Sequence, residues 1–379
     1  MAEWEKIRLG DVCKTNADTY SPKEKWDFAN YLDTGNITNN TIDSIQFIEL
    51  KNMKLPSRAK RKVKTDSIIY STVRPNQRHF GIIKSQPENF LVSTGFVVID
   101  VDTNVLNADF LYYLLMQNTL VDALQAIAEQ STSAYPAIKP SDIENLEIEI
   151  PDLATQKKIS DILSSLDRKI AKNAEINKNL EQQANVLYQS FFSPNSGIQG
   201  KAVTLDKYCS IFTGKKNANA SIDGGKYKFF TCAPDTLQIN SYIYDGNAII
   251  VSGNGAYTGR TRFYSGRFDL YQRTYACTLL DGVNPNYIFP LYWFVKLELS
   301  KKIMGGTRGS AIPYIVMNDL AKFEFVYSDE MFDTYTPIFK SLTESIQANE
   351  LENEHLSDLR DTLLPQLMSA ELDVSEIDL

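Results

Sequence analysis

The sequence predicts an α+β protein in which two globular α/β units are separated by two long antiparallel coiled-coil helices, with an internal pseudo-two-fold repeat. Three observations predict this fold: a heptad pattern over 155–192, the return of that pattern further along the chain, and matching strand–loop segments before each helix. Apolar residues alternating at three- and four-residue steps form the seam of a coiled coil, which needs a partner helix. The repeat provides that partner within the same chain.

The two predicted helices share one seam pattern. The stretch 155–192 contains neither proline nor glycine, and a shift of 176 residues, as from Ile170 to Ile346, superimposes the second stretch on it. Each seam includes two asparagines at the same spacing, which lower stability but fix the register, because only a facing polar group satisfies a buried amide. The predicted seam residues are Leu163, Leu166, Ile170, Asn173, Asn177, Leu180, Leu187, Leu342, Ile346, Asn349, Asn353, Leu356 and Leu363. The alternative is two unrelated surface helices of similar composition.

The repeat continues upstream of the helices at an offset of 177 residues. S-A-Y-P at 133–136 matches S-A-I-P at 310–313, and Asn107 matches Asn284. The predicted segments are a first globular unit at 1–152, a central long helix at 153–193, a second globular unit at 194–330, a C-terminal long helix at 331–370 and an acidic tail at 371–379. We expect the second helix to start near Thr336-Pro337 and Pro365 to end or kink it. We expect the tail to fray.

Composition limits the classes of function. The chain has 379 residues and a net charge of −8, which argues against indiscriminate nucleic-acid binding but permits a local basic groove. Four cysteines and two histidines show no paired metal-ligand spacing, so we expect no metal site and reduced thiols. No apolar run reaches membrane length. A cytoplasmic protein is the resulting expectation.

Polar and basic segments at matching places in the two halves predict contacts with double-stranded DNA. Residues 51–64 carry seven positive charges and no acid, and arginine-bearing loops follow the apolar strands expected at 66–71 and 247–252. Arginine suits guanine, and asparagine or glutamine suits adenine. The candidate DNA-binding residues are Lys54, Arg58, Lys60, Arg61, Lys62, Arg74, Asn76, Gln77, Arg78, Ser133, Tyr135, Asn254, Tyr257, Arg260, Arg262, Arg308 and Ser310. The alternatives are a solvated charged face, ordinary exposed hairpins and plain turns.

Catalytic residue sets are not recognisable in the sequence. N-P-N-Y at 284–287 is similar to the N-P-P-Y motif of adenine methyltransferases, but the second proline is missing and no glycine cluster offers a site for S-adenosylmethionine. Because Asn284 matches Asn107, and both precede an apolar helix, an N-cap explains the motif better. We therefore predict a non-catalytic chain. The alternatives are a stand-alone N6-adenine DNA methyltransferase and a coiled-coil adaptor without DNA reading.

The whole chain resembles the specificity subunit of type I restriction–modification systems. The motifs that carry the resemblance, besides the two half-repeats, are I-P-x-x-x-x-Q-x-x-I at 150–159, L-D-x-K-I-x-x-N at 166–173, S-T-V-R-P at 71–75 and N-x-x-F-L-Y-Y-L-L at 107–115. The second half departs from the pattern, because Tyr327 stands near the place of the proline and the glutamine is lost.

The resemblance implies an architecture and a role. Two target recognition domains would each read one half of a bipartite DNA sequence, and the long helices would set the spacing. Two methyltransferase subunits and two restriction/translocase subunits would be the protein partners, and they would hold the S-adenosylmethionine and the ATP. The specificity subunit itself would have no catalytic activity and would serve in defence against foreign DNA.

Overall fold

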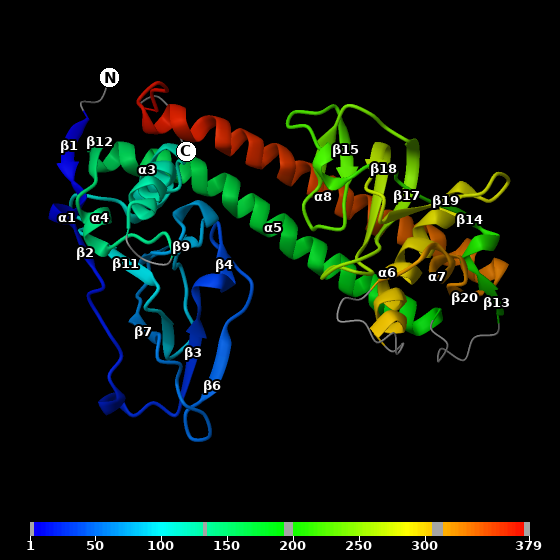
Figure 1. Ribbon diagram of the computed structural model, residues 1–379, viewed down its shortest axis with the longest axis horizontal. Helices are drawn as coiled ribbons and strands as arrows, with labels where there is room; N and C mark the ends of the chain where they lie inside the picture. Colours follow the sequence, from blue (N-terminus) through cyan, green and yellow to red (C-terminus); the bar gives the residue numbers. More distant parts are fainter. Residues whose placement is uncertain (1–3, 132–134, 193–199, 305–313, 375–379) are drawn as a thin grey trace. The chain divides into compact units, whose positions relative to one another are not determined.

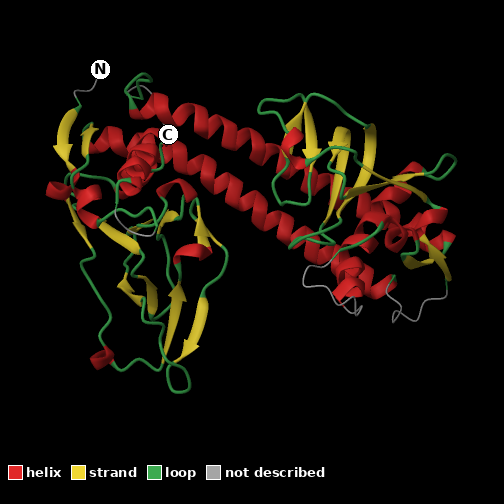
Figure 2. Cartoon of the chain, in the orientation of Figure 1, coloured by secondary structure: helices red, strands yellow, loops and turns green. Residues whose placement is uncertain are grey.

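The computed structural model describes residues 4–131, 135–192, 200–304 and 314–374, and helices and strands mix throughout (Figures 1 and 2). The chain divides into two compact units, Met1–Ile170 with Glu354–Leu379, and Ala171–Asn353. Each unit includes one part of the long helix α5 (Leu153–Phe191) and one part of the long helix α8 (Asp329–Met368). The units therefore cut across the five predicted segments, and that five-part division stays a prediction.

The first unit contains two four-stranded sheets, in the strand orders β2-β11-β8-β9 and β6-β3-β10-β7, and two smaller pairs, β1·β12 and β4·β5. The strands are β1 Glu5–Arg8, β2 Cys13–Thr15, β3 Phe28–Leu32, β4 Ile37–Thr38, β5 Thr41–Ile42, β6 Gln46–Glu49, β7 Ala59–Lys62, β8 Ile68–Ser71, β9 Phe80–Ile82, β10 Phe90–Ser93, β11 Phe96–Val101 and β12 Glu147–Ile150. The shorter helices are α1 Leu9–Val12, α2 Ala108–Leu115, α3 Asn118–Glu129 and α4 Pro140–Glu144.

Strand β8 lies at the centre of the first unit, and all four of its residues are buried. Alternate side chains of a strand point to opposite faces of the sheet. Ile68 and Tyr70 accordingly join the cluster formed with helix α2, whereas Ile69 joins a second cluster with Val92 and Val98. Burial on both faces fixes the position of β8, and with it the start of the loop that follows.

The second unit contains one six-stranded sheet, in the order β14-β19-β17-β18-β15-β16, and the pair β13·β20. The strands are β13 Lys201–Thr204, β14 Cys209–Thr213, β15 Tyr227–Phe230, β16 Leu237–Ile239, β17 Tyr244–Ser252, β18 Thr261–Leu270, β19 Thr274–Leu279 and β20 Glu324–Tyr327, and the shorter helices are α6 Ile288–Met304 and α7 Met317–Ala321. The first eight residues of α6 are buried on all sides, as expected of a helix enclosed by other elements. Phe192, Phe332 and Phe339 of the long-helix region pack in the same cluster.

Within the second unit, α5 and α8 are joined by the seam asparagines. The Nδ2 of Asn173 donates to the Oδ1 of Asn353 at 2.9 Å, and the Nδ2 of Asn349 donates to the Oδ1 of Asn177 at 2.7 Å. Residue numbers rise along one helix as they fall along the other, so the two segments run antiparallel. The sequence predicted the seam positions, and the structure adds which asparagines face each other.

Within the first unit, a charged group joins the same two helices. The carboxylate of Asp167 on α5 accepts hydrogen bonds from Arg360 on α8, at 2.8 Å, and from the hydroxyl of Tyr113 on α2, at 2.7 Å. This pairing raises the pKa of the Arg360 guanidinium. Every predicted seam residue of α5 and α8 is buried or half-buried in its unit.

Helix α8 begins earlier than the predicted start near Thr336-Pro337, and it does not end at Pro365. It starts at Asp329, so Thr336 and Pro337 lie inside it, and it continues past Pro365 to Met368. Burial of the side chains of Met331 and Phe332 favours the two additional turns at its start. A proline costs an interior helix one hydrogen bond. The extra apolar burial outweighs that loss here.

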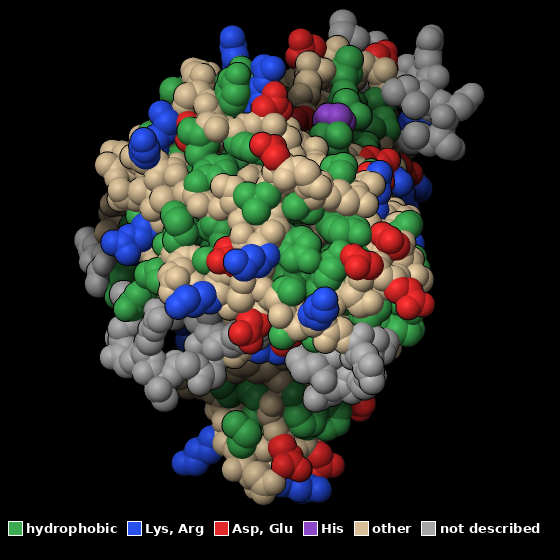
Figure 3. Space-filling model, turned by 90° about the vertical axis from the view of Figure 1, so that its right-hand side faces the viewer, with side chains coloured by type: hydrophobic (Ala, Val, Ile, Leu, Met, Phe, Trp, Pro, Cys, Tyr) green, Lys and Arg blue, Asp and Glu red, His purple; other side chains and the backbone are tan. Residues whose placement is uncertain are grey.

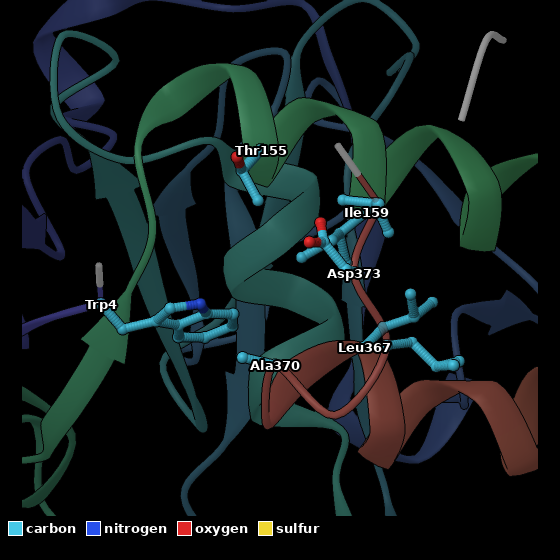
Figure 4. A pocket seen from close by; sticks show the side chains of 8 residues that line it. Trp4, Thr155, Ile159, Leu367, Ala370 and Asp373 are labelled. Carbon is cyan, nitrogen blue, oxygen red and sulfur yellow. The ribbon is translucent and has the colours of Figure 1, made fainter. Parts of the chain in front are cut away.

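The expected fraying of the tail is wrong for residues 371–374. The chain reverses at Ala370, whose φ is 58°, and the side chain of Val374 is 2% exposed. These residues complete a small pocket with Trp4 and Ile159 (Figure 4). Apolar side chains among the acidic residues explain why the tail packs against the first unit. Residues 375–379 lie outside the described part.

Gln156 of the predicted I-P-x-x-x-x-Q motif is fully buried at the start of α5. Its side chain accepts from the N–H of Asn107 at 2.8 Å and donates to the carbonyls of Val105, at 3.0 Å, and Pro151, at 2.8 Å. Phe332 occupies the equivalent turn of α8 and is also fully buried. Apolar packing in the second unit thus replaces three hydrogen bonds of the first.

Replacing Gln156 by alanine should destabilise the first unit by roughly 2–4 kcal/mol, because three backbone groups would lose a fully buried hydrogen-bond partner. Urea unfolding measures the change, and amide hydrogen exchange at 107–115 localises it. The matched control is Gln182→Ala on the exposed face of α5, which we expect to change stability by less than about 0.5 kcal/mol. Equal effects of the two substitutions would contradict the role given to Gln156.

Candidate functional site

The first candidate loop, 72–79, connects β8 to β9 in the first unit. At its base the N–H of Ser71 donates to the carbonyl of His79 at 2.9 Å, and the N–H of Ile138 donates to the carbonyl of Thr72 at 2.8 Å. The second bond ties the loop to the segment after helix α3. Two distant parts of the chain therefore hold the loop in place.

The second candidate loop, 253–260, connects β17 to β18 in the second unit and is closed in the same way. The N–H of Ser252 donates to the carbonyl of Arg260 at 2.9 Å, and the N–H of Ile315 donates to the carbonyl of Gly253 at 2.8 Å. The two loops have the same length and the same closing bonds. Their residues therefore correspond one to one, with Arg260 at the place of His79.

The correspondence extends to two left-handed backbone positions. Arg74 and Arg78 have φ values of 48° and 54° in the first loop, and Gly255 and Gly259 have φ values of 83° and 84° at the same positions of the second. Glycine adopts this conformation readily, whereas another residue loses about 1–2 kcal/mol. The first loop thus contains arginine at two positions where the backbone favours glycine.

Arg78 is held by its own unit. Its guanidinium donates to the carbonyl of Met116 at 3.0 Å and to the side-chain oxygen of Asn118 at the start of α3. Beside it, the N–H of Asn76 donates to the side chain of Gln125 at 3.3 Å. These bonds hold the loop against α3. The guanidinium of Arg78, which the sequence predicted would contact DNA, is thus already hydrogen-bonded within its own unit.

Arg262 is also turned inward. Its guanidinium donates to the carbonyls of Thr231, at 3.4 Å, and Ala233, at 2.5 Å, and lies over the ring of Phe230 at 5.5 Å. Burial lowers the pKa of Arg262 to about 10, which leaves it protonated at neutral pH. The side chain braces the segment after β15, and a base contact would require it to release that segment.

Arg74 and Arg260 differ from these two, because both are exposed. Each guanidinium lies over an exposed tyrosine, Arg74 at 5.6 Å from the ring centre of Tyr135 and Arg260 at 5.9 Å from that of Tyr257. A cation over an aromatic face is attracted to the ring. Each unit therefore presents one arginine–tyrosine pair at its candidate loop, and the exposed Asn76 and Gln77 lie beside the first pair.

The basic run at 51–64 is divided by strand β7. Lys54, Arg58 and Lys60 are exposed, whereas Arg61 and Lys62 are half-buried. The ammonium of Lys62 pairs with Glu24 at 2.5 Å and lies over the ring of Trp26 at 5.5 Å. Because strand residues alternate between faces, the run does not form one continuous basic surface. On the face drawn in Figure 3, basic and acidic side chains are interspersed.

The remaining candidates divide into two groups. Asn254 is half-buried and pairs through its backbone with Tyr314. Ser133, Arg308 and Ser310 lie outside the described residues. The predicted DNA contacts of all these side chains stay predictions.

The N-P-N-Y segment starts a helix, as the repeat suggested. The side chain of Asn284 accepts from the N–H of Asn286 at 3.0 Å, and the hydroxyl of Tyr287 donates to Asp333 at 2.9 Å. The side chain of Asn107 accepts from the N–H of Phe110 at 2.9 Å in the first unit. Both asparagines thus cap helices.

Neither a metal site nor a membrane-spanning helix is found among the described residues. No group of three or more histidine, cysteine, aspartate or glutamate side chains among them is placed to hold a metal ion. Within the same residues, every helix is too short or too polar to cross a bilayer.

Sequence reasoning missed the division of the arginines into exposed and braced pairs. The bracing partners Met116, Asn118, Thr231 and Ala233 lie about 30–40 residues away in the chain, and carbonyl groups have no sequence signature. One signal was present in the sequence: a gapless match of the loops places Arg74 against Gly255.

Comparisons with known proteins show similarity to one family over part of the chain. Residues 1–182 match the family described as "Type I restriction modification DNA specificity domain". Over 230 residues, 59% of this chain, the sequence is 32% identical to the type I restriction enzyme HindI specificity subunit of Haemophilus influenzae. The first part of the chain is therefore similar to type I restriction–modification specificity subunits. A second relative, the EcoDI specificity subunit of Escherichia coli, is 39% identical over 123 residues, 32% of this chain and 26% of that protein.

The matched part covers 48% of the Haemophilus influenzae protein, so the chain matches about half of that relative's length. Among solved structures, the type I restriction–modification S subunit of M. genitalium is similar with a TM-score of 0.61, over 97% of this chain and 96% of that one, at 16% identity. This likeness supports a shared mixed α and β fold for the family.

The two neighbouring arginines of the second loop allow a matched test of stability. Arg262→Ala should lower the stability of the second unit by about 1–3 kcal/mol, because the carbonyls of Thr231 and Ala233 lose a charged donor. Arg260→Ala removes the same charge from an exposed side chain and should cost less than about 0.5 kcal/mol. Thermal unfolding of both variants measures the difference. A larger loss for Arg260→Ala would contradict the assignment.

Proposed function

We propose that this chain is the DNA sequence-specificity subunit of a type I restriction–modification complex. In this proposal each compact unit is a target recognition domain that reads one half of a bipartite site on double-stranded DNA. The chain has no catalytic role, and S-adenosylmethionine and ATP bind to partner subunits. The similarity of residues 1–182 to the specificity-domain family and the names of the similar proteins support the proposal.

The strongest support for the proposal is a loop that the two units share. Both units present, after equivalent strands, a loop of the same length with an exposed arginine lying over an exposed tyrosine. Arginine forms paired hydrogen bonds with guanine in the major groove, and aromatic rings and arginine planes suit nucleic-acid surfaces. Two such loops in one chain fit a two-part DNA target. They also support an internal pseudo-two-fold repeat of globular unit and long helix.

The long helices, in this proposal, form an antiparallel coiled coil that sets the distance between the half-sites and binds two methyltransferase subunits, to which two restriction/translocase subunits are added. Apolar side chains that remain exposed on the helices support a docking role, since exposed apolar surface marks protein contacts. They are Leu153, Ile176, Val186, Ile338, Leu351 and Leu359, between 36% and 64% exposed.

Co-expression with a methyltransferase subunit of the same system, followed by genome-wide mapping of N6-methyladenine, tests the proposal directly. We expect methylation at a two-part motif with a fixed gap. The control is the same methyltransferase subunit without this chain, which should methylate nothing. A one-part or palindromic motif would contradict two reading units, and no methylation beside an active partner would favour an adaptor without DNA reading.

The spacing role predicts a change in the gap. Deleting 171–177 together with 347–353 removes one heptad from each helix and both facing asparagine pairs. Seven residues span about 10.5 Å of helix, equal to about three base pairs. The gap should shorten by about three base pairs with both half-sites unchanged. Duplicating the same two heptads should lengthen it equally, and an unchanged gap in both variants would refute the role.

A further inference from the structure

Arg74 has an unfavourable backbone conformation that the second unit avoids. Its φ and ψ are 48° and 71°, and the next residue is Pro75. A residue before proline is restricted to extended conformations, which makes a left-handed one more costly still. At the same place the second loop has Gly255, followed by Ala256, where neither restriction applies. The first loop would fold more easily with glycine at 74.

No hydrogen bond or ion pair of the Arg74 side chain with the described residues of its unit offsets this conformational cost. It is exposed, and its contact with the rest of the described structure is the ring of Tyr135 at 5.6 Å. Among the described residues its guanidinium has no hydrogen-bond or ion-pair partner. Arg78 has a similar backbone conformation, but its guanidinium donates to Met116 and Asn118. Backbone strain that no interaction within the protein offsets is typical of functional sites.

We propose that Arg74 determines base identity in the half-site read by the first unit, where it contacts a guanine, and that Tyr135 positions its guanidinium. This inference rests on the proposed function and assigns the specificity within it. Stacking on a ring orients the plane of the guanidinium, and a bidentate contact with the O6 and N7 of guanine depends on that plane. A phosphate contact would need only the charge.

Arg78 is the anchor of the same loop. Its two hydrogen bonds to the α2–α3 region hold the left-handed turn that presents Arg74. Arg260 is the exposed arginine of the second candidate loop, but it follows a glycine and occupies the place of His79. The exposed arginines of the two units therefore stand at different positions of two equivalent loops. This difference fits a site whose two halves differ in sequence.

The test maps N6-methyladenine after co-expression of the full-length chain with its methyltransferase subunit, for the wild type, Arg74→Gly and Arg74→Lys. Arg74→Gly copies the second loop and removes the strain. We expect one or two positions of the first half-site to become degenerate, with the second half-site and the gap unchanged. At a degenerate position, the preference for guanine over other bases should fall at least tenfold, as expected for a lost base contact of about 1–3 kcal/mol.

Arg74→Lys separates base reading from phosphate contact. Lysine retains the charge but lacks the planar fork, so the same degeneracy is expected. Recovery of the wild-type motif with lysine would overturn the inference and make Arg74 a phosphate contact.

The two variants of Tyr135 test its positioning role. Tyr135→Phe keeps the ring and should retain the motif, whereas Tyr135→Ala should reduce methylation at first-half-site guanine. The control for charge is Lys14→Ala, an exposed residue on β2 outside the loop, which should change nothing.

A stability measurement distinguishes a reading residue from a structural one. Because glycine suits the left-handed position, Arg74→Gly should keep or raise the thermal midpoint, by up to about 2–4 °C. A drop of several degrees would show that Arg74 supports the fold and would overturn the strain argument. If the wild-type chain gives no two-part motif, the proposed function fails. If it gives one that Arg74→Gly leaves intact, only this inference fails.

Discussion

The burial of one apolar stripe on each long helix is the constraint on which the rest of the molecule depends. A single helix cannot cover its own stripe, so α5 and α8 pack together in each unit and against the short helices there. The polar groups within the seam make that packing selective. In the second unit Asn173 faces Asn353, and in the first Asp167 joins Arg360 to Tyr113. A slip along the helices would leave these groups buried without partners, at a cost of about 1–3 kcal/mol each.

The candidate loops are placed by the same cores. Strand β8 and the last five residues of β17 are buried on both faces, so the ends of these strands are fixed, and an antiparallel contact from a distant segment closes each loop. Rigid support of this kind matters for recognition, because a base contact depends on the orientation of a side chain. Conversely, the two units reach the same loop geometry with different residues. The same holds at the starts of the long helices, where Gln156 and Phe332 occupy equivalent, fully buried positions with different chemistry.

Arginines close together in the sequence have different roles because their surroundings differ. Arg78 and Arg262 end on backbone carbonyl groups and brace loops, whereas Arg74 and Arg260 end over tyrosine rings at the surface. Burial decides the outcome: a guanidinium removed from water must find acceptors, and the nearest ones are carbonyls at loop ends. Exposed guanidinium groups remain available for a ligand. Net charge cannot separate the two cases, since all four carry the same charge.

The sequence by itself determined the seam, the position of the candidate loops and the resemblance to one family. These features are local or periodic, and a heptad pattern or a repeated strand–loop segment can be recognised without a folded chain. Tertiary structure alone decided which arginines are exposed, which asparagines face each other, and where α8 begins. Thr336-Pro337 has the chemistry of a helix start, yet the burial of Met331 and Phe332 moved the start to Asp329. Each of these outcomes depends on contacts between residues far apart in the chain, and such contacts exist only after folding.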